Sequence, residues 1–121
     1  MARPTVLLCD DSRALRMLTA SQLAECGYEL AGEAGDGAGA VALYRALQPD
    51  VVLLDLVMPD IDGKQALERI MAIDPQARVI VLSSLGAQGD IEQCLRLGAR
   101  SYLQKPVDPA VLRRVLDAAM A

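Results

Sequence analysis

The 121-residue chain contains no histidine, no tryptophan and no phenylalanine. Without histidine, the His-based general bases, nucleophiles and metal sites of many enzymes are excluded. Cysteine is also scarce: Cys9, Cys26 and Cys94 are odd in number and lack close metal-type spacing. We therefore expect reduced core thiols, as in cytoplasmic proteins. No apolar run is long enough to cross a bilayer and no signal-type segment opens the chain, so neither export nor membrane insertion is expected.

Basic residues are fewer than acidic residues, 12 against 16, which gives a net charge of −4. Nucleic-acid backbones favour basic surfaces, so we expect no direct nucleic-acid partner. A composition of 53% hydrophobic and 23% charged residues fits a globular chain rather than a disordered one. The length allows one domain, residues 1–121, around one core.

Short runs of Val, Leu and Ile alternate with helical patterns along the chain. The expected strands are residues 5–9, 28–33, 50–54, 78–82 and 100–104. Between them, apolar residues recur at i, i+3 and i+4, as at Leu67, Ile70 and Met71. Residues 51–54 are continuously apolar, which is typical of a strand covered on both faces. Five strand–helix repeats predict an α/β three-layer sandwich with a five-stranded parallel sheet.

Polar side chains gather where the predicted strands end. They are Asp10 and Asp11 after the first, Asp55 after the third, Ser83 and Ser84 after the fourth, and Lys105 after the fifth. Taken singly, such residues are typical of turns, helix caps or surface charge. Ligands of open parallel sheets bind beyond the carboxyl ends of the strands, however, and the topology brings these positions to that edge.

The repulsion among three carboxylates at one edge of the sheet must be offset by a cation or by proton uptake. At ~4 Å and an effective dielectric near ~20, each pair repels by roughly 4 kcal/mol. Lys105 supplies only one positive charge, whereas hard divalent ions prefer oxygen ligands. We therefore expect Mg²⁺, or alternatively Mn²⁺, in this place. Asp55 is then suited to be a carboxylate nucleophile for phosphoryl transfer, with Lys105 and Ser83 stabilising the phosphoryl oxygens.

The same residues occur in an ordered set of motifs. These are Asp10-Asp11-Ser12, the Leu-Asp-Leu-Val-Met-Pro of residues 54–59 with Asp62-Gly63 after it, the Val-Leu-Ser-Ser of residues 81–84, and Lys105-Pro106. From Val6 to about Val115 the chain resembles the receiver domains of two-component response regulators. For the strand order we adopt 2-1-3-4-5, which is borrowed from doubly wound flavodoxin-like folds, CheY among them, and not worked out from this sequence.

The resemblance implies a role for each matching position. Asp55 is the implied phosphoacceptor, and Asp10 and Asp11 hold Mg²⁺ together with Asp55. The backbone carbonyl of Val57 is a further implied ligand. Lys105 contacts the phosphoryl group, and a cis bond to Pro106 is expected.

Two further positions correspond to the family's switch residues. Ser83 takes the hydroxyl position that pulls its loop toward the phosphate. Tyr102 takes the position of an aromatic ring that turns inward when the loop moves, although an ordinary strand aromatic is the alternative reading. Val57 and Leu85 are apolar where some fast-hydrolysing receivers carry polar groups, so we expect slow intrinsic dephosphorylation.

The implied function is a phosphorylation-controlled signalling switch and not an enzyme. Its phosphoryl donor would be a sensor histidine kinase, and its output a partner on the face of the fourth helix, fifth strand and fifth helix. Residues 27–34 and 73–75 resemble single-domain chemotaxis regulators of the CheY type, expected as a monomer or weak dimer. Residues 83–85 also resemble the receiver of the chemotaxis methylesterase, so an isolated receiver of a larger regulator stays open.

Two other functional classes use a similar fold or nucleophile. A haloacid-dehalogenase-like phosphohydrolase normally has a second Asp two residues after its nucleophile, where this chain has Val57. A flavodoxin-like cofactor carrier needs a phosphate loop rich in Gly, Ser and Thr after the first strand, where Asp10 and Asp11 would repel a phosphate. Both alternatives are disfavoured.

Overall fold

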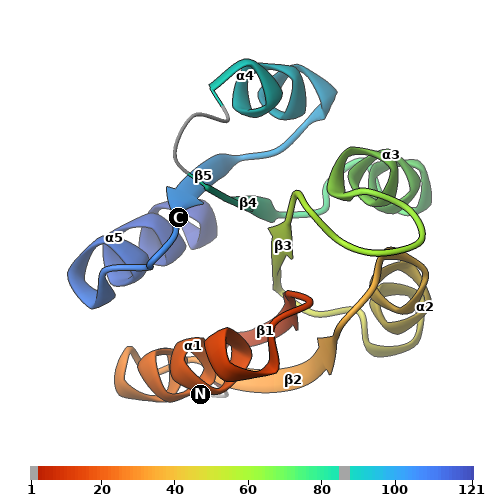
Figure 1. The fold of residues 1–121 in the computed structure, drawn as a ribbon. Coiled ribbons are helices and arrows are strands. Elements are labelled where there is room, and N and C mark those ends of the chain that lie inside the picture. Colours follow the sequence, from red (N-terminus) through yellow and green to blue (C-terminus); the bar gives the residue numbers. More distant parts are fainter. Residues whose placement is uncertain (1–2, 85–87) are drawn as a thin grey trace.

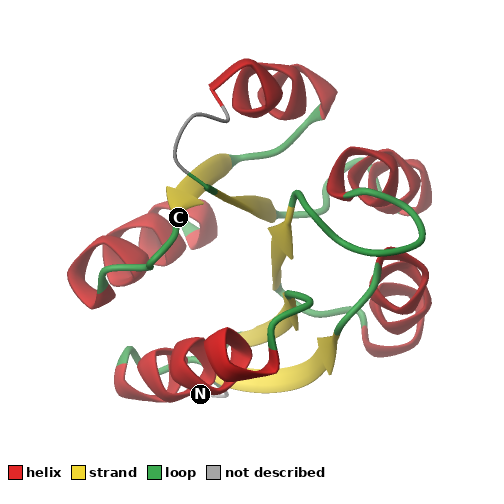
Figure 2. Ribbon diagram, viewed as in Figure 1, coloured by secondary structure: helices red, strands yellow, loops and turns green. Residues whose placement is uncertain are grey.

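A computed structural model describes residues 3–84 and 88–121, in which five strands alternate with five helices (Figures 1 and 2). The strands are β1 (Thr5–Cys9), β2 (Glu29–Ala34), β3 (Val51–Asp55), β4 (Val79–Ser83) and β5 (Ser101–Gln104). The helices are α1 (Arg13–Glu25), α2 (Gly37–Leu47), α3 (Gly63–Ile73), α4 (Gln88–Leu97) and α5 (Pro109–Met120). The predicted strand–helix repeat is therefore confirmed.

All strand pairs are parallel, in the order β2-β1-β3-β4-β5. The expected strand order 2-1-3-4-5 is therefore confirmed. The β1–β2 pairing shifts register between Val6 and Leu7. Because β1, β3 and β4 lie inside the sheet and are covered on both faces, nearly all their residues are buried, as the continuous apolar runs predict.

Helices cover both faces of the sheet, α1 and α5 on one and α2, α3 and α4 on the other (Figure 1). Two hydrophobic cores result, one on each face of the sheet, where the chain length predicts a single core. One packs Leu23 of α1 and Leu112 of α5 against the sheet, and the other packs Leu67 and Ile70 of α3 against the opposite face. In the part of the chain that the structure describes, no helix has the length and apolar character needed to span a bilayer.

Short polar side chains cap the amino ends of the helices. The Ser12 hydroxyl accepts from the amide of Leu15, and Asp36 from the amide of Gly39. Pro109 occupies the first turn of α5. Gly27 follows α1 with φ +84°, a left-handed conformation that glycine adopts without steric cost.

The predicted strands begin one residue too early at β2, β3, β4 and β5, and end one residue too early at β2, β3 and β4. Asp55 and Ser83 are the last residues of their strands and do not follow them. The ladder extends this far because Asp55 pairs with Leu82, and Ser83 with Gln104. Both polar side chains are therefore anchored on regular sheet, which orients them more rigidly than a loop would.

Candidate functional site

The carboxyl ends of β1 and β3 bring three aspartates together. Asp10 directly follows β1, Asp11 comes next, and Asp55 ends β3. Each has a carboxylate oxygen within 4.8 Å of the others. Asp10 and Asp55 are buried, whereas Asp11 is exposed. The convergence predicted from the strand ends is thus present in the fold.

Lys105 reaches this cluster from the end of β5. Its Nζ atom lies 2.7 Å from Oδ2 of Asp55 and 3.7 Å from Oδ2 of Asp10. Its backbone amide donates to the carbonyl of Ser83 at 2.8 Å, which fixes the residue against the end of β4. The peptide bond between Lys105 and Pro106 is cis, as the resemblance implies.

Backbone amides orient the two buried carboxylates. Oδ1 of Asp10 accepts from the amide of Ser12 at 2.9 Å, and Oδ1 of Asp55 accepts from the amide of Val57 at 3.1 Å. One oxygen of each carboxylate is therefore held by backbone, and the other faces Lys105. Val57 is 71% exposed, so this position is held by its backbone rather than by packing.

Burial and neighbouring charges shift the pKa values of Asp55 and Lys105 in opposite directions. Burial raises the pKa of Asp55 above its ordinary value, and hydrogen bonds from Lys105 and Val57 offset part of that rise. Burial alone would lower the pKa of Lys105, but its hydrogen bond to Asp55 and the negative charges around it raise that pKa overall. The ammonium is thus held in its charged form beside the carboxylates.

Two residues that support the site from outside the carboxylate cluster were missed by reasoning from the sequence. The Arg16 guanidinium on α1 donates to the backbone carbonyl of Asp10 and lies 3.3 Å from a carboxylate oxygen of Glu33. It ties the Asp10 backbone to β2. Asp60 anchors the connection after β3 by accepting from the backbone amides of Gly37 and Ala38. Neither carries a recognisable signal, because a surface Arg or a turn Asp is common and the partners lie far along the chain.

The proposed switch residues occupy different surroundings. Ser83 is buried, and its Oγ atom has no hydrogen-bond partner among the described residues. A buried hydroxyl without a partner is costly, and a group placed beside this Oγ atom could accept from it or donate to it. Tyr102 on β5 is 47% exposed and does not join the carboxylate cluster. Leu85 lies outside the described residues.

The donor set fits a hard divalent cation. Three carboxylates supply oxygen ligands from positions close enough for one ion to contact, and Asp11 keeps the cluster open to solvent. Mg²⁺ typically takes a few carboxylates and retains several waters, which an exposed cluster allows. These residues are compatible with a Mg²⁺ site.

Comparison with known proteins agrees with this geometry. A sequence model of the response regulator receiver domain matches residues 6–117. The chain belongs to the response regulator receiver family. The receiver is 40% identical over 113 residues to the chemotaxis protein CheY of Thermotoga maritima, covering 93% of this chain and 92% of that protein. It is 45% identical over 102 residues to a protein-glutamate methylesterase of Anaeromyxobacter dehalogenans, covering 84% of this chain but 30% of that protein.

Solved structures show the same fold. A CheX–CheY–BeF3–Mg complex from Borrelia burgdorferi contains a chain that matches this receiver with a TM-score of 0.92 and 33% identity, over 97% of this chain and 89% of that one. The response regulator domain of Thermotoga maritima CheB matches with a TM-score of 0.85 and 34% identity, over 98% of both chains. The receiver is thus a two-component signalling domain with a CheY-like fold.

Proposed function

We propose that the chain is a phosphorylation switch in which Asp55 accepts a phosphoryl group from a sensor histidine kinase. The observation that carries this proposal is the position of Lys105, whose Nζ atom lies 2.7 Å from one oxygen of a buried Asp55 carboxylate. A purely structural ion pair would not need the additional carboxylates of Asp10 and Asp11 around it. An acceptor for a phosphoryl group, whose oxygens carry negative charge, needs cationic surroundings, and this arrangement offers Lys105 together with a place for a metal ion.

The chemistry requires little of the protein beyond positioning. An oxygen of the Asp55 carboxylate forms a bond to phosphorus, while the P–N bond of the donor phosphohistidine breaks and its electron pair returns to the imidazole, which takes up a proton. Asp10, Asp11, Asp55 and the Val57 carbonyl would hold Mg²⁺, which supplies charge neutralisation for the phosphoryl oxygens. Lys105 contacts one of those oxygens and remains charged throughout.

Ser83 and Tyr102 form the proposed switch. Among the described residues the buried Ser83 Oγ atom has no hydrogen-bond partner, so a phosphoryl oxygen on neighbouring Asp55 would offer it an acceptor. A shift of the Ser83 end of β4 would bear on β5, because Ser83 pairs with Gln104 and Val81 pairs with Tyr102. Tyr102 is then free to exchange its half-exposed position for a more buried one.

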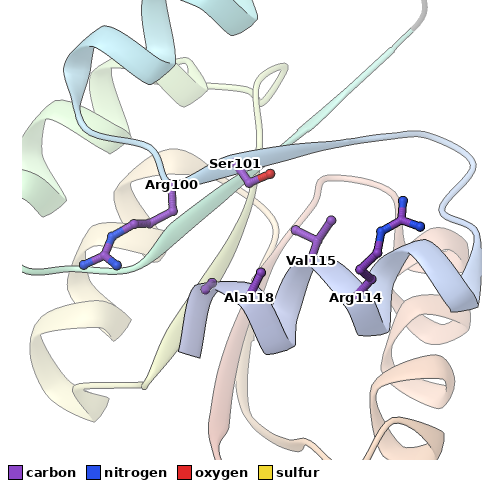
Figure 3. Close-up of a pocket in the computed structure, with 6 residues that line it drawn as sticks. Arg100, Ser101, Arg114, Val115 and Ala118 are labelled. Carbon is purple, nitrogen blue, oxygen red and sulfur yellow. The ribbon is translucent and has the colours of Figure 1, made fainter. Parts of the chain in front are cut away.

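The output surface in this proposal is the face of α4, β5 and α5. A hollow of about 420 Å³ lies there beside the β5 edge (Figure 3). Arg100 and Arg114 lie at its two ends with their guanidinium groups pointing apart, and Val115 and Ala118 of α5 lie between them (Figure 3). Exposed Leu95 and Tyr102 add apolar surface on α4 and β5. An apolar floor with polar ends is typical of a protein-docking surface.

We further propose a regulator of the CheY type, in the cytoplasm, as a monomer or weak dimer. Supporting this, the match to the Thermotoga maritima protein spans nearly the whole length of both chains. The alternative is the receiver of a larger regulator such as a methylesterase, favoured by the 45% identity to the Anaeromyxobacter protein. In both cases the domain acts by binding a partner and does not turn over a substrate of its own.

Chemical trapping tests the acceptor assignment. After incubation with Mg²⁺ and acetyl phosphate, borohydride reduces an aspartyl phosphate to homoserine, which peptide mapping locates. We expect homoserine at position 55 and not at Asp10 or Asp11. Trapping at another carboxylate, or none in the presence of Mg²⁺, would contradict the proposal.

A further inference from the structure

The connection between β3 and α3 is fastened to a helix that is distant in sequence. Both carboxylate oxygens of Asp60 accept from the first turn of α2: Oδ1 from the amide of Gly37 at 2.9 Å, and Oδ2 from the amide of Ala38 at 3.1 Å. The helix's own cap, Asp36, accepts instead from Gly39 at 2.6 Å. The amino end of α2 is thus capped partly from outside, by a residue 22 positions beyond Ala38.

The backbone is shaped for this contact. Asp60 has φ +65°, a left-handed conformation that Asp tolerates better than most non-glycine residues. Neighbouring Ile61 lies against Gly37 so closely that a Cβ atom at Gly37 would collide with it. A strained conformation and a glycine contact at the same place indicate that the loop is held firmly against α2. Figure 1 shows this connection arching from β3 across to α2 before it enters α3.

The same connection carries the backbone of Val57. The Val57 amide donates to Oδ1 of Asp55, and the amide of Gly63 closes the loop by donating to the carbonyl of Leu56 at 2.9 Å. The loop is therefore fixed at its base, by Leu56 and Gly63, and at its tip, by Asp60. Val57 lies between these fixed points, and its exposed side chain provides no packing of its own.

We propose that Asp60 is a positioning residue, whose contact with the first turn of α2 holds the backbone of Val57 in place for binding a divalent cation with Asp55. This inference rests on the proposed function, because it concerns the same metal site. Asp60 itself touches neither the carboxylate cluster nor the phosphoryl group. Its effect is carried by the loop, in the way that outer-shell contacts set the orientation of ligands in other metal sites.

Metal binding is the direct test. Mn²⁺ serves as the probe, and the electron paramagnetic resonance signal of unbound Mn²⁺ gives the dissociation constant. Asp60→Asn keeps the left-handed preference but turns one acceptor into a donor, and Asp60→Gly removes the side chain while tolerating the same φ. We expect both to weaken Mn²⁺ binding, on the order of tenfold for Asp60→Gly. In the metal-free protein, the amide protons of Val57 and Gly37 should exchange faster.

Asp108→Asn is the matched control. Asp108 likewise accepts from two helix amides, those of Ala110 and Val111, but it caps its own helix, α5. The Asp108→Asn substitution should change the Mn²⁺ affinity by no more than about twofold. This change is well below the loss expected for the Asp60 variants. Because Asp60 also carries charge, the comparison is repeated at about 1 M salt, where the Debye length is about 3 Å and remote charge is screened. The loss should persist there.

The outcomes separate this inference from the proposed function. Suppose that wild type binds Mn²⁺, and that Asp60→Gly shows the same Mn²⁺ affinity and the same amide exchange as wild type. That result would overturn the role of Asp60 alone. A loss that disappears at high salt would also overturn it, since the effect would then be electrostatic. No Mn²⁺ binding by wild type would contradict the metal site itself, and with it the positioning role.

Discussion

Lys105 bridges Asp55 and Asp10: its Nζ atom lies 2.7 Å from Oδ2 of the first and 3.7 Å from Oδ2 of the second. One ammonium group therefore serves two buried carboxylates, with Asp11 close by. A single positive charge cannot balance three negative ones, so without a cation this edge of the sheet carries excess negative charge. That imbalance favours a function that brings in positive charge and works against a purely structural role.

Neutralising Asp55 should stabilise the metal-free protein. Burial raises the pKa of Asp55, which means that the ionised carboxylate opposes folding at neutral pH. We expect Asp55→Asn to raise the free energy of unfolding by roughly 1–2 kcal/mol at neutral pH, within the usual range for relieving a buried, incompletely compensated polar group. Urea unfolding in the presence of a chelator measures this difference.

The sign of the pH dependence follows from the same shift. The folded pKa of Asp55 lies above the unfolded value, so the destabilisation in wild type develops as the pH rises from the unfolded pKa through the folded one. Below about pH 3.9, the unfolded value, the carboxyl is protonated in both states and the advantage of Asp55→Asn should disappear. An advantage that grows toward acid pH would contradict this account.

Lys105→Ala should still accept a phosphoryl group but respond poorly to it. The nucleophile and the acidic cluster remain, whereas the link from the phosphoryl group to β5 through Lys105 is lost. Intact mass after acetyl phosphate treatment measures acceptance, and the accessibility of Tyr102 to iodide measures the response. If the phosphorylated Lys105→Ala protein shows the same change in Tyr102 accessibility as wild type, Lys105 has no role in the switch.

Tyr102 provides a built-in reporter, because the chain has no tryptophan and only three tyrosines. Tyr28 and Tyr44 are each 5% exposed, against 47% for Tyr102. Iodide should therefore quench mainly the fluorescence of Tyr102, and phosphorylation should reduce that quenching if the ring turns inward. Tyr102→Leu is the control and should abolish the quenchable component. Unchanged quenching after full phosphorylation would favour the reading of Tyr102 as an ordinary strand residue.

Much of the fold could be predicted from the sequence. The continuous apolar strands depend on local sequence, and the structure confirms them; the caps Ser12 and Asp36 likewise act on residues close to them in sequence. The strand order is borrowed from doubly wound flavodoxin-like folds, since periodicity does not say which strands are neighbours. The boundaries were wrong at Asp55 and Ser83 because a polar residue was read as the end of a strand, whereas pairing across the sheet continues through both.

The site was only partly predictable, for a related reason. Asp10, Asp11, Asp55 and Lys105 follow from topology, because strand ends meet at one edge. The contacts of Arg16 with the Asp10 carbonyl and of Asp60 with α2 depend on side-chain conformations and loop geometry. No spacing rule relates Asp60 to Gly37, so a single sequence carries no signal of this contact.

The lifetime of the phosphorylated state should depend on Val57. This residue is 71% exposed and its side chain is apolar, so it offers no group to orient an attacking water. We expect Val57→Asn to speed release of phosphate by on the order of tenfold, less than the roughly 10²–10⁴-fold contribution of a full general base. Val57→Ala removes the bulk without adding a polar group and should have a smaller effect. Equal rates for wild type, Val57→Ala and Val57→Asn would show that this position does not set the lifetime.

Intact mass spectrometry tests the central claim most directly. Wild type, Asp55→Asn and the Asp108→Asn control are each incubated with acetyl phosphate, with Mg²⁺ and with a chelator. The account predicts a gain of one phosphoryl group in wild type and in Asp108→Asn, only when Mg²⁺ is present, and none in Asp55→Asn. A phosphoryl adduct of equal yield in Asp55→Asn, or one that forms fully in the chelator, would contradict Asp55 as the metal-assisted acceptor.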